Sequence, residues 1–327
     1  MFDLVDQYQR KFSYLRLSVT DRCGFKCVYC LPNGYVAPPG KEPDLSSDEI
    51  RRLVTAFATL GVSKVRLTGG EPTIRRDIVE LVHLISRIPG IKKTALTTNG
   101  SRLKELARPL HQAGLTAVNV SIDSLDRKRF SEITGTDRLE AVLAGVESAL
   151  SAGFETVKVN AVLLRDWNDH EVAHFIEWVR DRPISVRFIE LMRTGNQGDF
   201  FNYRHLTAGK IQLELLKSGW IQNVKHTTDG PAVVYRHPQY QGTMGLIAPY
   251  SRDFCKGCNR LRVSSTGGLR LCLFGEKDES LRPYLTDDSQ HDELVARIQT
   301  LVMAKPISHH LHEGNYGNTW NLAGIGG

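Results

Sequence analysis

The chain has 327 residues, of which 41% are hydrophobic and 24% are charged, and its formal net charge is +6. This balance is typical of a folded globular protein and excludes a disordered or fibrous one. No apolar stretch approaches the roughly 18 residues of a membrane span, and the start MFDLVDQYQRKF has acids where a secretory signal has an apolar core, so we expect a cytoplasmic protein.

Strand-like and helix-like segments alternate from residue 14 to residue 191, as judged by the period of their hydrophobic residues. Ser46 and Glu49 form a capping-box pattern at the start of the first helix, and Gly61 lies at its expected end. The expected strands are 14–20, 62–70, 92–100, 116–123, 155–164 and 184–191, and the expected helices are 46–61, 77–88, 101–114, 137–153 and 169–181.

Six strand-then-helix units predict a parallel sheet, because parallel neighbours need crossovers of this length. Six are fewer than the eight of a closed TIM barrel, so we expect an α/β fold with a partial (βα)6 TIM-type barrel that is open on one side. Ligands of parallel α/β proteins bind beyond the C-terminal ends of the strands. The polar segments found there are the first cysteine loop, TGGEP, TTNG, SIDS and ELMRTG.

The pattern changes after residue 191. We expect a loop at 194–205, a helix at 208–219, strand-like pieces near 232–237 and 244–250, and a helix at 291–305. The chain is therefore divided into a barrel core, residues 1–191, and an extension, residues 192–327, that closes the open side.

The positive charge is compatible with a nucleic acid, an anionic surface or a polyphosphate ligand. No block of like charges occurs, and basic residues are spread singly through strand-like segments, which favours a pocket over a binding tail. These residues include Arg16, Arg66, Lys158, Arg187, Arg260 and Arg262.

The six cysteines form two groups of three: Cys23, Cys27 and Cys30, and Cys255, Cys258 and Cys272. Without a secretion signal, metal or cluster ligation is favoured over disulfides. Structural zinc needs four ligands, and the first loop has no histidine. An iron–sulfur cluster fits better, and three thiolates would leave one iron of a cubane open to a molecule that offers an amine and a carboxylate.

The segment CGFKCVYC, with an aromatic residue before its third cysteine, resembles the signature of the radical SAM superfamily. LTGGEP at 67–72 is similar to the motif that meets the methionyl amino group of S-adenosylmethionine (SAM), and NVSIDS at 119–124 to the segment near its ribose. Glycine fits the first motif, because a backbone can approach a ligand closely only where no Cβ intervenes. Glu71 in this motif is left open between a structural residue and a proton carrier.

The second cysteine group carries two arginines between its second and third thiolates, in DFCKGCNRLRVSSTGGLRLCLF. Arg260 and Arg262 alternate along a short strand, so both point to one face. Their guanidinium forks suit a phosphate or a purine edge.

These motifs and the terminal GIGG together resemble the GTP 3',8-cyclase family of molybdenum cofactor biosynthesis, through nearly the whole chain and least clearly at 192–245. The resemblance implies that Cys23, Cys27 and Cys30 hold a SAM-binding 4Fe-4S cluster, through which they act in catalysis, and that Cys255, Cys258 and Cys272 hold a second 4Fe-4S cluster. It places SAM contacts at Tyr29, Gly70, Ser121 and Met192, and GTP contacts at Arg16, Arg66, Thr97, Lys158, Arg260, Leu261 and Arg262. A triphosphate would also supply the anion that strand-borne cations aimed into a barrel need.

The family's reaction implies a lyase that converts GTP to (8S)-3',8-cyclo-7,8-dihydroguanosine 5'-triphosphate. A 5'-deoxyadenosyl radical derived from SAM removes the ribose C3' hydrogen, C3' then attacks C8 of the guanine, and a further electron and proton complete the cyclised nucleotide. The implied partners are a source of electrons and cyclic pyranopterin monophosphate synthase as the product acceptor, with neither nucleic acid nor membrane; a homodimer is compatible with the sequence. The tail AGIGG, which ends in Gly326 and Gly327, is expected to reach the reaction chamber.

Two alternatives stay open on the residues alone. One is a radical SAM maturase that acts on a peptide side chain, against which the strand-borne cations argue. The other is a basic RNA-binding module in which both cysteine groups hold zinc, and it predicts salt-sensitive RNA affinity.

Overall fold

The computed structural model describes residues 3–195, 197–224, 230–275, 277–317, 319 and 322–325. Six parallel strands form the centre of a mixed, 12-stranded sheet, in which each of the six pairs with the next along the chain. All six lie within the expected ranges, so the predicted strands are confirmed. They are β1 (Tyr14–Ser18), β2 (Lys64–Thr68), β3 (Lys93–Thr98), β4 (Ala117–Ser121), β5 (Thr156–Leu163) and β6 (Ile184–Glu190).

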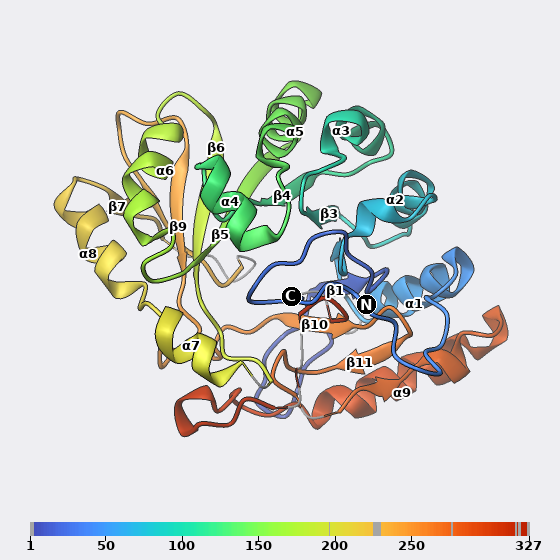
Figure 1. Ribbon diagram of the computed structural model, residues 1–327. Coiled ribbons are helices and arrows are strands. Elements are labelled where there is room, and N and C mark those ends of the chain that lie inside the picture. The colour runs from blue at the N-terminus through green and yellow to red at the C-terminus, as the bar shows by residue number, and fades with distance from the viewer. Residues whose placement is uncertain are drawn as a thin grey trace.

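Helices form an arc around the outer face of these strands (Figure 1). The capping box at the start of the first helix is present: Ser46 Oγ accepts from Glu49 N at 3.2 Å, and Glu49 Oε2 accepts from Ser46 N at 2.8 Å. The helices of the core are α1 (Ser47–Thr59), α2 (Ile78–Ser86), α3 (Leu103–Gln112), α4 (Arg127–Thr134), α5 (Leu139–Ala152) and α6 (Val172–Trp178).

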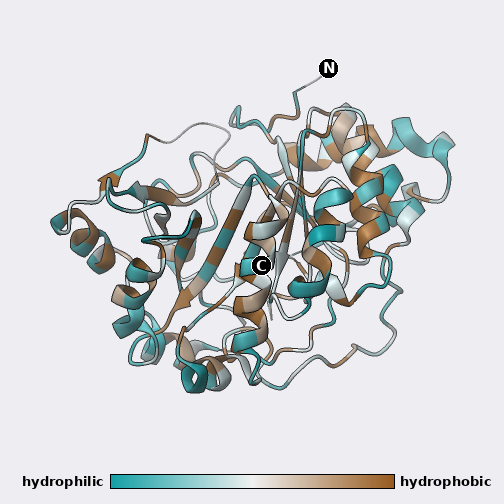
Figure 2. Ribbon diagram, turned by 90° about the horizontal axis from the view of Figure 1, so that it is seen from above, coloured by the Kyte–Doolittle hydropathy of each residue, from teal (hydrophilic) through white to brown (hydrophobic). Residues whose placement is uncertain are grey.

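Helix α4 was not among the expected elements, because its segment is short and rich in charge. Local capping stabilises it instead: the Asp126 side chain accepts a hydrogen bond from Arg129 N, and Gly135 ends the helix in the left-handed conformation. Most buried apolar side chains of the helices and strands meet in one large core, and Ile133, Leu164 and Leu191 form a second, smaller cluster. Figure 2 shows hydrophilic and hydrophobic residues on the same helices, as amphipathic helices on a sheet require.

The extension adds strands to both edges of the six-stranded core. Strand β9 pairs with β6 and β10 pairs with β1, both in parallel, and the sheet continues outward through antiparallel strands. The α/β partial-barrel fold with an extension is thereby confirmed. The added strands are β7 (Ile221–Gln222), β8 (Val233–Arg236), β9 (Thr243–Ile247), β10 (Arg260–Val263), β11 (Gly268–Arg270) and β12 (Glu279–Ser280).

The described residues of the extension form the α-helices α7 (Gly198–Arg204), α8 (Gly209–Lys217) and α9 (His291–Met303). The loop expected at 194–205 is wrong for its second half, which forms α7. Phe201 of α7 packs against His205 and Tyr250, so tertiary contacts stabilise a helix of weak intrinsic propensity. None of the helices in the described part of the chain is both long and apolar enough to cross a bilayer.

Candidate active site

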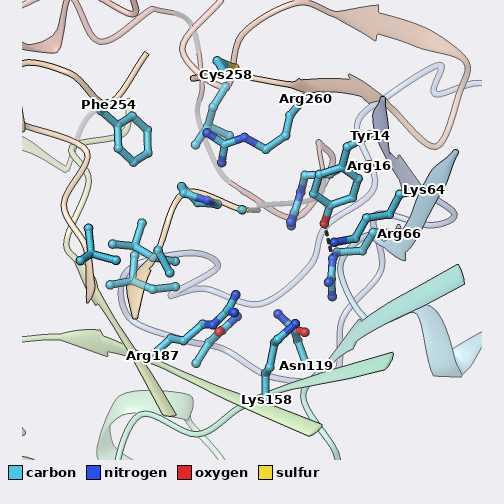
Figure 3. Close-up of a pocket in the computed structure, with 18 of the residues that line it drawn as sticks. Tyr14, Arg16, Lys64, Arg66, Asn119, Lys158, Arg187, Phe254, Cys258 and Arg260 are labelled. Carbon is cyan, nitrogen blue, oxygen red and sulfur yellow. Dashed lines mark hydrogen bonds between the residues drawn. The ribbon is translucent and has the colours of Figure 1, made fainter. Parts of the chain in front are cut away.

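A cavity of about 1080 Å³ opens between the central strands, and its wall is rich in cations (Figure 3). The described residues that line it include no Asp or Glu. Such a wall is electrostatically complementary to a polyanion. The cations are Arg16, Lys64, Arg66, Lys92, Lys93, Lys158, Arg187, Arg236, Arg260, Arg262 and Lys305.

Strand register brings these cations together. Arg16 pairs in register with Arg66 on one side and with Arg262 on the other, so three guanidinium groups share one row across β2, β1 and β10. Tyr14 pairs with Lys64 and Arg260 in the next row, two residues earlier on each strand. Because side chains alternate along a strand, both rows face the cavity.

The opposite wall comes from β4, β5 and β6. Asn119 pairs with Lys158, and Asn160 pairs with Arg187. In Figure 3, Lys158, Asn119 and Arg187 point across the cavity toward the two rows that contain Arg16 and Arg260. Cations on both walls would therefore contact a ligand in this cavity from two sides.

The guanidinium of Arg66 is held in a fixed orientation. Its Nε donates to the Tyr14 hydroxyl, and its Nη1 donates to Leu96 O at 3.1 Å and to Thr97 Oγ1 at 3.2 Å. Arg66 is buried although no described carboxylate faces it in the cavity. The described wall holds many more cations than Tyr14 could neutralise, so this arrangement is built for an anionic ligand.

The charged form of Lys158 is also unfavourable in this cavity wall. Burial, together with repulsion from Arg187, Arg66 and Lys64, lowers the pKa of Lys158 to about 7. An anion between these groups would favour its charged form again.

Two amide oxygens are available to a ligand of this cavity. The Oδ1 atoms of Asn119 and Asn160 are buried and have no hydrogen-bond partner among the described residues. Both side chains line the cavity. A buried acceptor without a partner is uncommon in folded proteins, and a ligand hydroxyl or N–H would satisfy it.

The first cysteine loop is held by the glycine motif that follows β2. Gly70 N donates to Thr20 O at 2.8 Å, and Glu71 N donates to Arg22 O at 2.8 Å. A Cβ on Gly70 would lie 2.2 Å from Arg22 O, so only glycine allows this approach. Room for the backbone before Cys23 is therefore a reason for glycine here, in addition to room for a ligand.

Glu71 is a structural residue in this geometry. It is buried, and its Oε1 accepts from Thr73 N at 3.0 Å, from Thr73 Oγ1 at 2.6 Å and from Thr98 Oγ1 at 2.7 Å. Its Oε2 accepts from Asn99 N at 2.6 Å. The carboxylate thus ties the loop after β2 to the end of β3.

The three thiols of the first group lie close enough to influence one another. Burial raises the pKa of Cys27 well above its usual value, and Asp123, Cys30 and Cys23 raise it further through their charges. Burial also raises the pKa of Cys30 to about 11, although the N–H groups of Leu322 and Ala323 donate to its sulfur. Neighbouring thiolates with no cation beside them are unfavourable, and iron ions would supply the positive charge.

The thiols of the second group face the cationic cavity. Cys255, Cys258 and Cys272 all line it. Burial would raise the pKa of Cys258, but the charges of Lys305 and Arg260 outweigh burial and lower it. Within the ranges that the structure describes, no three His, Cys, Asp or Glu side chains converge as they would around a single metal ion. Three thiolates in each group are the donor type and number that fit two iron–sulfur clusters with one open iron each.

The C-terminal segment connects the first cysteine group with Arg262, whose pKa is influenced by the nearby Cys272 and Cys258 of the second group. Leu322 and Ala323 contact the Cys30 sulfur, and Arg262 Nη1 donates to Ile325 O at 3.4 Å. The two groups therefore belong to one region of the molecule. Gly326 and Gly327, which were expected to enter the chamber, lie outside the described residues.

Comparison with known proteins agrees with this arrangement. Residues 17–179 match the family model of the radical SAM superfamily, and residues 184–311 match the model named Molybdenum Cofactor Synthesis C. A GTP 3',8-cyclase of Aeromonas hydrophila subsp. hydrophila is 53% identical over 100% of this chain and 97% of its own length. A GTP 3',8-cyclase of Yersinia pestis is 52% identical over 100% of both chains.

The chain belongs to the GTP 3',8-cyclase family. The family expected from the motifs is thereby confirmed. The crystal structure of Streptococcus suis SuiB bound to S-adenosylmethionine has the same fold, with a TM-score of 0.65 and 14% identity over 91% of this chain and 69% of that one.

The structure brings most of the GTP contacts expected of this family to one cavity. Arg16, Arg66, Lys158, Arg260 and Arg262 line it. Thr97 does not line it but accepts a hydrogen bond from Arg66. Leu261 is fully buried and pairs with Leu15, so its side chain points away from the cavity and only its main chain is available there.

The SAM contacts expected of a family member are more dispersed. Met192 lines the cavity, whereas Tyr29, Gly70 and Ser121 do not. The Tyr29 hydroxyl donates to Asp123 Oδ2 at 2.8 Å. Gly70 abuts the start of the cysteine loop, and Ser121 ends β4 in register with Asn160.

The cavity wall also includes residues that were given no ligand contact from the sequence, among them Tyr14, Lys64, Asn119, Arg187 and Lys305. Tyr14 and Lys64 each precede an assigned arginine by two positions. The strand period of two was thus a usable signal for them. The place of Arg187 in the wall depends on the sheet order, and that of Lys305 depends on the position of α9. Neither could be read from the local sequence.

Proposed function

We propose that this chain is a radical SAM enzyme that converts GTP to (8S)-3',8-cyclo-7,8-dihydroguanosine 5'-triphosphate, an early step of molybdenum cofactor biosynthesis. One observation carries the proposal. In this member of the GTP 3',8-cyclase family, cations line a cavity in which no described carboxylate is found, and the second cysteine group opens onto that cavity. A nucleoside triphosphate fits both features, because its phosphates match the cations and its base can reach the cysteines.

The triphosphate would bind the rows of β1, β2 and β10 together with Lys158. Guanidinium groups bind phosphate oxygens through paired N–H donors, and Arg66 is already oriented for this by Tyr14 and Thr97. The Asn119 and Asn160 amide oxygens would accept hydrogen bonds from ribose hydroxyls or guanine N–H groups. Arg260, Arg262 and the main chain of Leu261 would place the base beside the second cysteine group.

Cys23, Cys27 and Cys30 would hold one 4Fe-4S cluster, and Cys255, Cys258 and Cys272 the other. When bound, SAM and the first cluster would supply the 5'-deoxyadenosyl radical that removes the C3' hydrogen of GTP. C3' would then bond to C8 of the guanine, and one further electron from the electron donor and one proton would complete the 7,8-dihydro product. Tyr29, Gly70, Ser121 and Met192 would position SAM.

Exclusion of water is the remaining task of the chain, since an organic radical must meet no other partner. Residues 322–325 contribute by lying against Cys30 and Arg262. We infer that residues 192–327 act as a cover for the barrel core of residues 1–191.

The partners follow from the reaction. We infer that a cytoplasmic electron donor reduces the clusters and that cyclic pyranopterin monophosphate synthase takes up the product. A homodimer is compatible with this function.

The decisive experiment mixes the anaerobically purified, reduced protein with SAM and GTP. We expect about eight irons per chain and the formation of 5'-deoxyadenosine together with the cyclised nucleotide. Deoxyadenosine without a change in the nucleotide would favour the peptide maturase. Zinc in place of iron, with salt-sensitive RNA binding, would favour the RNA module.

A further inference from the structure

Tyr14 occupies a distinctive place in the wall of the cavity. It is buried, it lies on β1 in register with Lys64 and Arg260, and its hydroxyl forms hydrogen bonds with both Arg66 and Arg16. The Lys64 Nζ lies 4.6 Å from the centre of its ring. Figure 3 shows the hydroxyl aimed at the cations rather than at the apolar core.

Among the described residues that line the cavity, Tyr14 is the one besides the cysteines whose side chain can become an anion. The groups that face it are Arg16 on its own strand, Lys64 and Arg66 on β2, and Arg260 on β10, all of them cations. Burial alone would raise the pKa of Tyr14, but the charges of Arg66, Arg16 and Lys64 outweigh burial and lower it to about 7. Near neutral pH a large share of the molecules therefore carries a phenolate here.

We propose that Tyr14 is a positioning residue of the GTP site, which holds Arg16 and Arg66 in place as a phenolate and takes up one proton when a triphosphate binds. This inference rests on the proposed function. The phosphate oxygens take over the neutralisation of Arg16 and Arg66, so the phenolate loses its electrostatic support and accepts a proton from solvent. The neutral hydroxyl still accepts from Arg66 Nε, and the guanidinium keeps its orientation.

Lys158 also takes up a proton when the triphosphate binds, because a nearby triphosphate raises its lowered pKa. The γ-phosphate of GTP contributes in the opposite sense, since binding to cations favours its ionised form. A phosphate loses its last proton at a pH of about 6, so the contribution of GTP vanishes at a pH of about 8. Proton uptake at that pH then reports on the protein.

The experiment is isothermal titration calorimetry of GTP into the cluster-loaded protein without a reductant, so that no turnover occurs. Titrations at a pH of about 8, in amine and sulfonate buffers with different ionisation enthalpies, give the number of protons taken up per GTP. We expect Tyr14→Phe to reduce this number by roughly one, and Lys158→Met to reduce it by a similar amount. Tyr284→Phe, whose ring lies outside the cavity, is the matched control and should keep the wild-type number.

A second measurement needs no variant. Binding of GTP to the wild-type protein should remove the ultraviolet absorbance of one tyrosinate in a difference spectrum. Equal proton uptake by the wild-type and Tyr14→Phe proteins, or an unchanged tyrosinate signal, would overturn the role of Tyr14 while GTP binding stands. If the wild-type protein binds no GTP, the proposed function fails and this inference fails with it.

Discussion

The Tyr29 hydroxyl donates a hydrogen bond to Asp123 Oδ2 over 2.8 Å, and this bond joins the loop that carries Cys27 and Cys30 to the end of β4. Asp123 is buried, and its other oxygen accepts from Val162 N at 2.8 Å. One carboxylate thus links the first cysteine loop, β4 and β5. The position of the cysteine loop depends on this link as well as on its own sequence.

Replacing Tyr29 by Phe should destabilise the protein. The change leaves one oxygen of a buried carboxylate without its donor, which costs about 1–3 kcal/mol of unfolding free energy. Urea unfolding of the anaerobic protein measures the loss. Tyr203→Phe is the control, because the Tyr203 side chain is 73% exposed and should have no effect. Equal stability of Tyr29→Phe and wild type would show that the bond does not hold the loop.

Alanine substitutions at two glycines near the first cysteine group should have opposite effects on the stability of the protein. In Gly70→Ala, the new Cβ would collide with Arg22 O and displace the segment before Cys23 at a cost of about 1–3 kcal/mol or more. In Gly24→Ala, the new Cβ meets nothing within 4 Å, and the loss of chain entropy in the unfolded state should make the change neutral or stabilising by up to about 1 kcal/mol.

Iron content distinguishes these two variants. Gly70→Ala should bind fewer irons than wild type after anaerobic reconstitution, and Gly24→Ala should bind as many. A Gly70→Ala protein with a full iron content and unchanged SAM affinity would contradict the steric argument.

Glu71→Gln tests whether this carboxylate is structural. The amide carbonyl can replace Oε1, but the NH₂ group would face the Asn99 N–H, donor against donor, at a cost of about 1–3 kcal/mol. We expect a lower midpoint of thermal unfolding than in Glu80→Gln, an exposed control on α2. A variant with wild-type stability that releases deoxyadenosine but no product would instead indicate a proton carrier.

Lys158→Met should stabilise the protein in the absence of GTP while weakening GTP binding. Replacing a buried charge by an apolar side chain of similar volume gains about 1–4 kcal/mol where the charge is costly. Burial and repulsion from Arg187, Arg66 and Lys64 lower the folded-state pKa of Lys158 to about 7 from 10.5, so below pH 7 both states are protonated and the folded state bears the full cost.

Between the two pKa values only the unfolded lysine binds the proton, so the stability of the wild type rises with pH. The advantage of Lys158→Met should therefore be largest below pH 7 and shrink toward pH 10.5. Urea unfolding at several pH values measures it, and Lys128→Met, an exposed control on α4, should show no such trend. An advantage that does not change with pH would contradict the assigned cause.

Local pattern was sufficient for the six parallel strands, the main helices and both cysteine groups. Alternation along β10 already placed Arg260 and Arg262 on one face, because the side-chain period of a strand is independent of its neighbours. Helices α4 and α7 could not be predicted in this way. They depend on a cap at Asp126 and on packing of Phe201, which no hydrophobic period records.

The cavity itself depends on contacts between distant parts of the chain. Register across β1, β2 and β10 decides that Tyr14 meets Lys64 and that Arg16 meets Arg66, and the position of residues 322–325 decides that Cys30 and Arg262 share one segment. Cysteine spacing and strand period could be read in advance because they are short-range properties. The low pKa of Tyr14 and the orientation of Arg66 arise only when β1, β2 and β3 pair, since electrostatic coupling depends on distance in space. The enclosure of the cations also needs β10, which lies more than 200 residues from β1 in the chain.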